Sequence, residues 1–205
     1  MEHPRHHGLQ ADRSEARLCL AFRPMRGEGH GQLAAGMVFR RNLVLYRQPA
    51  GAAQQQVAGG AIDLLRHSVA KVQQAHPFAI HAWVVLPDHL HCILSLPEGD
   101  TDFPLRWRLI KSHFSRALPV NERRSQTRLR HGERGIWQRH YWEHLIQDEQ
   151  DYRHHMDYVH INPLKHGHVT RVADWPYSTF HHYVASGVYP LDWCGPGDGV
   201  LGGLE

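Results

Sequence analysis

The clearest pattern of apolar and polar residues begins at residue 61 and predicts a helix over 61–75. Its apolar residues recur three or four positions apart, so they share one face of a helix. They are Ile62, Leu65, Val69 and Val72. Two apolar runs follow, over 79–86 and 89–96, and each predicts a β-strand. Because Pro87 and Asp88 favour a turn between them, the two strands are expected to form a hairpin.

Two further helices are expected in the second half of the chain. The first covers 105–118 and carries several basic residues. The second begins at Asp148, whose side chain suits a helix N-cap, and acids in its first turn suit the helix dipole. It is expected to run to about residue 161, because Asn162 precedes Pro163 and the residue before a proline disfavours helical backbone.

The N-terminal part of the chain has a weaker pattern. Residues 1–58 are rich in Gly, Ala, Gln and Arg, and only 37–46 offers a candidate strand there. We therefore expect a divergent or poorly ordered N-terminal segment over 1–58, one main folded domain over 59–185 and a C-terminal tail over 186–205. The order of elements predicts an α+β sandwich, with an antiparallel sheet and helices mainly on one face.

Charge is distributed unevenly along the chain. The net charge is only +3 with neutral histidines. Between Pro104 and Trp142, however, ten Lys and Arg residues face two acids, and Trp and Tyr residues lie among them. This combination favours phosphate contact and base stacking, and so a nucleic-acid partner over a plain solvated loop. No run approaches the ~18–20 apolar residues that span a membrane, so a cytoplasmic protein without a membrane partner is expected. With a nucleic-acid partner, it is expected to be nucleoid-associated.

Two histidines stand two positions apart in the second predicted strand. His89 and His91 then point to the same face of the sheet, while Leu90, Cys92 and Leu94 point to the other and fill the core. A pair of imidazoles at this spacing can bind one divalent ion. The chain has 20 histidines, so this pair alone does not separate a metal site from an ordinary half-buried strand.

The third predicted helix adds a candidate nucleophile. Tyr158 and Asn162 are four residues apart and share a helix face if the last turn holds. His154 and His155 lie one turn earlier, on or near that face. A separate apolar stripe of the same helix is expected to face the sheet and consists of Tyr152, Met156 and Val159. A phenol is a poor nucleophile at neutral pH, and a metal ion on the scissile phosphate would compensate by neutralising charge. Taken alone, Tyr158 could equally be a core tyrosine.

Four blocks of sequence resemble one known family. They are WVVLPDHLHCILSLPEGD, RWRLIKSHFSRAL, RGIWQRHYWEHLIQDEQDYRHHMDYVHINPLKHGHV and ADWPYSTFHHYV, within about residues 60–194. These blocks are similar to those of the REP-associated tyrosine transposases, a bacterial branch of the HUH single-strand transposases. The blocks also occur in the order typical of that family.

The resemblance implies a ferredoxin-like fold and a set of site residues. His89 and His91 match the family's paired metal-binding histidines, Tyr158 matches its nucleophile, and Asn162 matches a proposed metal ligand. It also implies Mg²⁺ or Mn²⁺, a covalent 5′-phosphotyrosine, and a single-stranded or hairpin DNA partner carrying a REP palindrome. The residues we expect to contact DNA are Arg106, Arg108, Lys111, Arg116, Arg139 and Lys165.

One departure from the family leaves a second function open. The family's usual first strand is not recognisable here, and the segment 37–46 is a poor substitute for it. An incomplete sheet would favour a DNA-binding relic or regulator of palindromic elements without catalysis. A histidine-rich metal-binding protein is a third reading, which the clustered arginines disfavour. The sequence leaves the choice between monomer and homodimer open.

Overall fold

A computed structural model of the chain describes residues 39–44, 61–120, 124–137 and 142–195. The remaining parts of the predicted N-terminal segment and C-terminal tail lie outside the described residues, so the expected domain boundaries stay a prediction. The elements in chain order are β1 (Phe39–Val44), α3 (Ile62–Ala75), β2 (Ala79–Val85), β3 (Leu90–Ser95), α4 (Phe103–Ala117), α5 (Gln126–Arg130), β4 (Trp142–Ile146), α6 (Glu149–Lys165), the 3₁₀ turn η2 (Val172–Asp174) and α7 (Phe180–Ala185).

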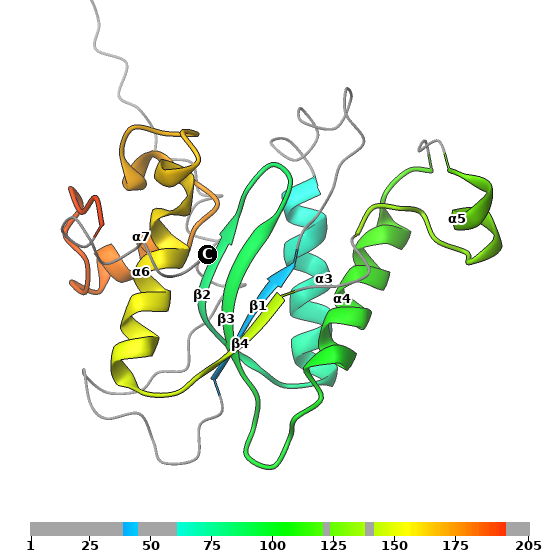
Figure 1. The fold of residues 1–205 in the computed structure, drawn as a ribbon, viewed down its shortest axis with the longest axis horizontal. Coiled ribbons are helices and arrows are strands. Elements are labelled where there is room, and N and C mark those ends of the chain that lie inside the picture. Colours follow the sequence, from blue (N-terminus) through cyan, green and yellow to red (C-terminus); the bar gives the residue numbers. More distant parts are fainter. Residues whose placement is uncertain (1–38, 45–60, 121–123, 138–141, 196–205) are drawn as a thin grey trace, which may run out of the picture.

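The four strands form one antiparallel sheet in the order β2-β3-β1-β4. With α3 after β1 and α4 after β3, this is the βαββαβ arrangement of a ferredoxin-like fold. The α+β class is thus confirmed. Helices α3 and α4 lie side by side on one face, as expected, whereas α6 covers the opposite face, so helices lie on both sides of the sheet (Figure 1).

The candidate N-terminal strand is a central strand of the sheet. β1 pairs along its length with β3 on one side and with β4 on the other. The poor match of segment 37–46 to the family's usual first strand therefore does not leave the sheet incomplete. Register is set by pairs such as Leu43 opposite His91. This pairing holds β3, and the histidine on it, in the middle of the sheet.

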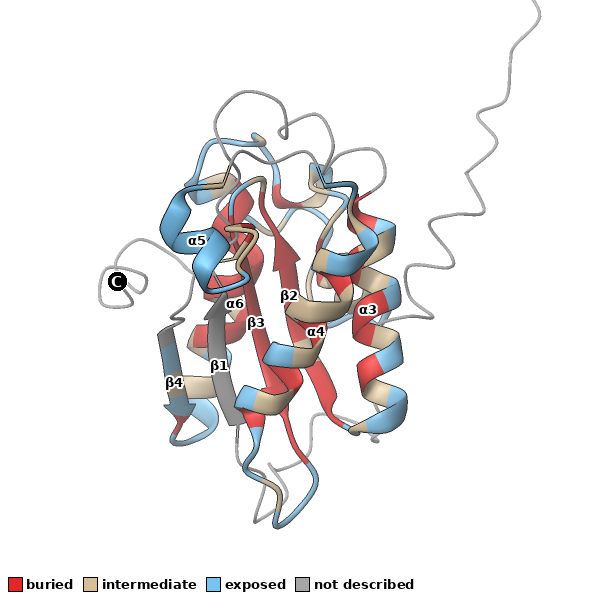
Figure 2. Ribbon diagram, turned by 90° about the vertical axis from the view of Figure 1, so that its right-hand side faces the viewer, coloured by how far each residue is buried: buried red, intermediate tan, exposed pale blue. Residues whose placement is uncertain are grey.

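Alternation along the inner strands divides the core into two layers. Leu90, Cys92 and Leu94 of β3 face α3 and α4, as predicted from the sequence. Ile93 faces α6, where it packs in one cluster with Met156 and Val159. Figure 2 shows that β2 and β3 are buried along most of their length. The expected apolar stripe of α6 therefore packs against the sheet, and this packing fixes the position of α6 relative to β3.

Three elements differ from the sequence-based expectation. α6 does not stop before Pro163 but continues to Lys165. The proline removes one helical N–H, but the turn is retained because Ile161 and Asn162 are buried and the backbone N–H of His166 donates to Asn162 O at 2.9 Å. Gln126–Arg130, where the sequence predicted no helix, forms the short helix α5, whose first turn is capped by the Ser125 side chain. β3 begins at Leu90, so the preceding histidine lies just before the strand.

Helix length also bears on the expected absence of a membrane partner. Among the helices that the structure describes, none combines the length and the apolar character needed to cross a bilayer.

A candidate metal and tyrosine site

The two predicted histidines meet at the tip of the β2–β3 hairpin. His89 lies just before β3 and His91 within it, and only 9% and 2% of their surfaces are exposed. Their ring centroids are 4.8 Å apart, and the ring planes are nearly perpendicular. The Nδ1 atom of His89 lies 2.7 Å from Asp88 Oδ1. We assign the proton to Nδ1, because the carboxylate can only accept; this leaves the Nε2 lone pair of His89 for a cation.

The predicted nucleophile lies beside this pair. The ring of Tyr158, on α6, meets the ring of His91 edge-on with centroids 5.5 Å apart. Lys165, two turns further along the same helix, places its Nζ 5.2 Å from the centroid of the Tyr158 ring. The packing of α6 on the sheet thus brings a phenol, two imidazoles and one ammonium group together.

Asn162 is fully buried one turn after Tyr158. Its Nδ2 donates to the backbone oxygen of Tyr158 at 2.5 Å. Within the part of the chain that the structure describes, its Oδ1 is buried and has no hydrogen-bond partner. A buried carbonyl oxygen without a donor is costly, so such an atom calls for an explanation. A bound cation would supply one, which agrees with the expected role of Asn162 as an oxygen ligand.

A third histidine, which the sequence reasoning missed, joins the pair. His166 is the C-cap of α6, and its ring centroid is 5.1 Å from that of His89, at 77°. One nitrogen each of His89, His91 and His166 lie within 4.8 Å of one another. Burial and the neighbouring His89 lower the pKa of His166. The helix was expected to end before Pro163, so the sequence KHGH that follows was not placed on it. The histidines of that sequence were the signal that could have revealed His166.

His155, one of the two other predicted histidines of α6, does not face the site. His155 is buried, and its Nδ1 lies 2.8 Å from a carboxylate oxygen of Asp151, whose other oxygen lies 2.8 Å from His144 Nε2. The two imidazoles are stacked at 4.6 Å with planes only 10° apart. Parallel rings cannot aim both lone pairs at one ion, since a metal lies in the plane of each ring that binds it. This cluster therefore links β4 to α6 and is not a second metal centre.

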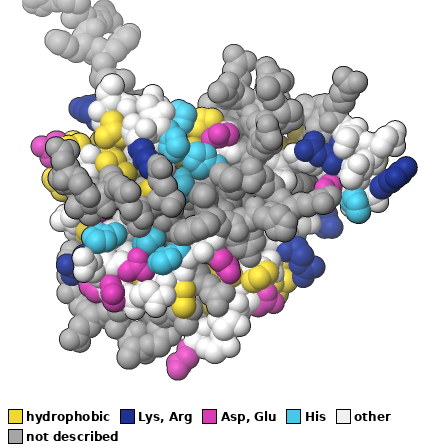
Figure 3. Space-filling view, in the orientation of Figure 1, with side chains coloured by type: hydrophobic (Ala, Val, Ile, Leu, Met, Phe, Trp, Pro, Cys, Tyr) yellow, Lys and Arg dark blue, Asp and Glu magenta, His cyan; other side chains and the backbone are white. Residues whose placement is uncertain are grey.

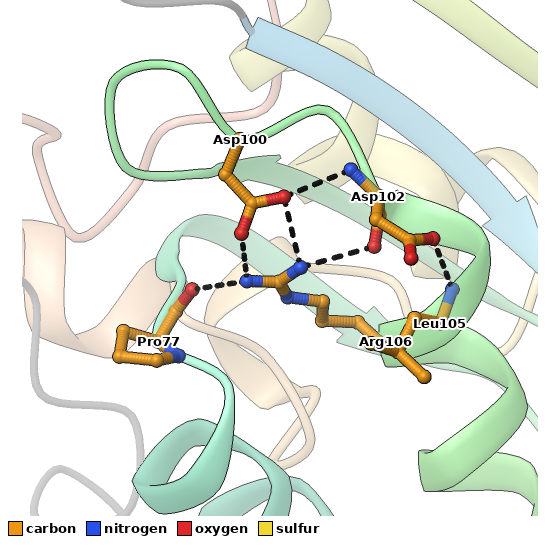
Figure 4. Close-up of polar contacts among 5 residues, drawn as sticks. All are labelled: Pro77, Asp100, Asp102, Leu105 and Arg106. Carbon is orange, nitrogen blue, oxygen red and sulfur yellow. Dashed lines mark hydrogen bonds and ion pairs between the residues drawn. The ribbon is translucent and has the colours of Figure 1, made fainter.

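Arg106 is a correction to the predicted DNA-binding set. Arg106 is 3% exposed, and its guanidinium forms an ion pair with Asp100. The guanidinium also donates to the backbone oxygens of Pro77 and Asp102, each at 3.2 Å (Figure 4). Because the side chain is buried and both terminal nitrogens are engaged inside the protein, Arg106 cannot contact a phosphate. Its role is structural, because it ties the loop before α4 to the end of α3.

The remaining predicted basic residues differ in exposure. Arg108 and Arg116 on α4 are exposed, Lys111 is half-buried, Lys165 is exposed beside Tyr158, and Arg139 lies outside the described residues. Burial lowers the pKa of Lys111. The predicted basic region also contributes Arg128 and Arg130, both exposed on α5. In Figure 3, Lys and Arg side chains gather on the right, over α5, and histidines gather in separate groups further left.

The side chains of this site fit a divalent cation. Three imidazole nitrogens and one amide oxygen are all ligands that divalent metals accept. They come from the hairpin tip and from the second half of α6, two elements that the core packs together. A ferredoxin-like sheet that brings an HxH pair against a helical tyrosine is the arrangement of the HUH single-strand transposases.

Comparison with known proteins places the chain in one family of that class. It is 53% identical over 133 residues to a REP-associated tyrosine transposase of Escherichia coli K12. The matched region covers 65% of this chain and 73% of that protein. It is 43% identical over 138 residues to a putative REP-associated tyrosine transposase of Haemophilus influenzae, covering 67% of this chain and 78% of the relative. The chain belongs to the family of REP-associated tyrosine transposases.

A solved structure agrees with this assignment. The structure of a REP-associated tyrosine transposase bound to a REP hairpin matches with a TM-score of 0.64 and 44% sequence identity, covering 83% of this chain and 92% of that one. No family model matches the chain.

Proposed function

We propose that this protein cuts and rejoins single-stranded DNA beside a hairpin, with Tyr158 as the nucleophile and a divalent cation held by His89, His91 and Asn162. The observation that carries the proposal is the edge-on contact of the Tyr158 and His91 rings. It brings a nucleophilic side chain and a metal-binding side chain, from elements far apart in sequence, to one point. The relatives, named as tyrosine transposases, support the same reaction.

The protein's own side chains would have different roles at the scissile phosphate. His89 is oriented by Asp88, and His91 is held within β3, so both rings are largely positioned before a cation binds. Asn162 Oδ1 adds an oxygen donor. When bound, the cation, Mg²⁺ or Mn²⁺, neutralises charge on the scissile phosphate and on the oxygen that leaves it. Lys165 supplies a further positive charge beside the phenol.

The proposed covalent step conserves the bond to phosphorus. Tyr158 Oη bonds to phosphorus while the bond from phosphorus to the 3′ oxygen breaks. The phenol proton passes to solvent, and the departing 3′ oxygen takes a proton from solvent, so protons balance. The products are a 5′-phosphotyrosine and a free 3′-hydroxyl. Because the phosphodiester is exchanged and not hydrolysed, the 3′-hydroxyl of another strand can reverse the step and join the ends.

The DNA surface would follow the exposed basic residues. Arg108 and Arg116 on α4 and Arg128 and Arg130 on α5 are available for phosphate contact, unlike Arg106. A hairpin partner is supported by the solved relative, which is bound to a REP hairpin. A protein acting on such DNA would be found with the nucleoid. The catalytic domain would then comprise the predicted residues 59–185 together with β1 (Phe39–Val44), which pairs with its strands.

A denaturing gel tests the proposal. The protein is incubated with Mg²⁺ or Mn²⁺ and a labelled hairpin oligonucleotide that carries single-stranded flanks. We expect a covalent adduct of slower mobility for the wild type and none for Tyr158→Phe. Tyr152→Phe, on the same helix but facing the sheet, is the matched control and should retain the adduct. Hairpin binding with no adduct under either metal would contradict catalysis and favour the regulator.

A further inference from the structure

We propose that His166 is a third imidazole ligand of the same metal centre, and that this donor set selects a transition-metal ion such as Mn²⁺ over Mg²⁺. The inference rests on the proposed function, since it concerns the cation held beside Tyr158. It adds a ligand to the set of His89, His91 and Asn162 that the resemblance implies, and it narrows the identity of the ion.

The spacing of the three rings suits one ion. Nitrogens of His89, His91 and His166 lie within 4.8 Å of one another. Nitrogens bound tetrahedrally at about 2.1 Å from one ion lie about 3.4 Å apart. The rings therefore need to approach one another by up to about 1.4 Å, which side-chain rotation, above all of the exposed His166, can provide.

The orientation of the rings points the same way. His89 is nearly perpendicular both to His91, at 81°, and to His166, at 77°. Two ring planes that cross share a line, and an ion on that line lies in the plane of both rings, as metal binding by imidazole requires. The stacked pair of His144 and His155 shows the opposite case, because its parallel planes share no such point. Of these two clusters of described residues, the one formed by His89, His91 and His166 has ring orientations that suit a shared ion.

The position of His166 on its helix also favours a cation. It is the C-cap of α6, where carbonyl groups leave a partial negative charge. Its backbone N–H is bonded to Asn162 O at 2.9 Å, so the residue stays in register with the site despite Pro163. Gly167 follows with φ +69° and turns the chain away. His166 is exposed whereas His91 is buried, so His166 closes the site on its solvent side.

The donor set decides which ion is preferred. Mg²⁺ favours oxygen ligands and retains its waters, whereas imidazole nitrogens favour later divalent metals. Three nitrogens and one amide oxygen therefore bind Mn²⁺, Co²⁺ or Zn²⁺ more tightly than Mg²⁺. A site with two imidazoles and more oxygen donors would show a smaller difference.

Metal titration of the full chain tests the inference without any cleavage. All proteins carry Tyr158→Phe, and affinities for Mn²⁺ and Mg²⁺ are measured by calorimetry, with the visible spectrum of bound Co²⁺ as a second readout. We expect Mn²⁺ to bind at least about tenfold more tightly than Mg²⁺. His166→Ala should weaken Mn²⁺ binding by at least roughly 100-fold and change the Co²⁺ spectrum. His168→Ala, an exposed histidine two residues further on, is the matched control and should leave both unchanged.

The outcomes separate this inference from the proposed function. If His89→Ala loses Mn²⁺ binding and His166→Ala does not, the HxH centre stands and the third ligand is refuted. If neither variant loses binding, the metal centre itself is wrong. His166→Gln, measured alongside with its thermal unfolding, guards against a folding defect at the helix cap. Equal affinity for the two metals would overturn the ion preference.

Discussion

The ring of Tyr158 meets the ring of His91 edge-on, with centroids 5.5 Å apart, although 66 residues separate them in the chain. The contact exists because β3 is an inner strand and α6 packs on the face of the sheet to which Ile93 points. His91, two residues before Ile93, points to the same face. Neither residue depends on a loop for its position. A phenol held this close to an imidazole can share a phosphate with the cation that we propose the imidazole binds.

His91→Ala should abolish cleavage and spare hairpin binding. The imidazole would hold the cation, whereas affinity for DNA comes mainly from phosphate contacts made by basic side chains. Adduct formation is followed on a denaturing gel and hairpin affinity by fluorescence anisotropy. Chelation of metal from the wild type should have the same effect as the substitution. If affinity falls as far as cleavage does, His91 has a structural role and not a metal-binding one.

Arg106→Ala should destabilise the fold, whereas Arg108→Ala should not. Removing Arg106 takes the ion-pair partner from the partly exposed Asp100 carboxylate and the hydrogen-bond donor from the backbone oxygens of Pro77 and Asp102. Leaving such backbone oxygens without their donor costs about 2 kcal/mol. The exposed Arg108, two positions further along the same helix, should change the free energy of unfolding by less than about 0.5 kcal/mol. Urea unfolding measures both, and equal effects would refute the structural role of Arg106.

Hairpin affinity should fall steeply with salt concentration, and basic residues of α5 should account for part of the slope. Each phosphate contact contributes about 0.9 to the slope of log affinity against log salt. Arg128→Ala, measured in the Tyr158→Phe background by anisotropy, should reduce the slope by roughly one contact. Arg171→Ala is the control, because Arg171 is engaged with Asp174 at 2.6 Å. A slope that Arg128→Ala leaves unchanged would remove α5 from the DNA surface.

Stability should decrease as pH falls below 6.5. Burial, with a smaller contribution from His181, lowers the pKa of His160 from 6.5 to about 3, and its ring lies among the rings of Phe180, Tyr183 and Tyr189. Between these pH values the unfolded chain binds a proton that the folded chain does not, so acid favours unfolding. The free energy of unfolding should fall by up to about 1.4 kcal/mol per pH unit from this residue.

A substitution checks the pH prediction. His160→Gln retains a polar partner for Thr179, which lies 3.0 Å from His160 Nε2, but cannot titrate. Urea unfolding between pH 7.5 and 5 should show a shallower slope for the variant than for the wild type. Part of the slope should remain, because burial also lowers the pKa of His81 to about 4. Identical slopes in both proteins would show that folding does not lower the pKa of His160.

The elements with strong patterns could be predicted from the sequence. The helix after residue 61, the β2–β3 hairpin and the stripe of α6 that faces the sheet follow from apolar periodicity alone. β1 gave a weak signal although it is a central strand, because its place in the sheet depends on pairing with β3 and β4, which are distant in sequence. α5 has no buried residue, so it has no apolar face for a pattern to reveal.

The site could be predicted in part, for similar reasons. His89, His91 and Tyr158 stood out by spacing and by the family blocks, and the structure brings them together. His166 was missed because a proline rule ended the helix too early, and packing overrode that rule. Arg106 was misassigned because charge does not reveal burial. Its carboxylate partner lies only six residues away, but the carbonyl of Pro77 that it also binds is brought near only by the fold.

Peptide mapping of the covalent adduct is the most direct test of the central claim. The wild-type protein is reacted with a hairpin oligonucleotide and metal, digested with a protease and a nuclease, and analysed by mass spectrometry. The account predicts one modified peptide, carrying a nucleotide 5′-phosphate on Tyr158. A phosphotyrosine on Tyr152 or on any other residue, in protein that cuts its substrate, would contradict it.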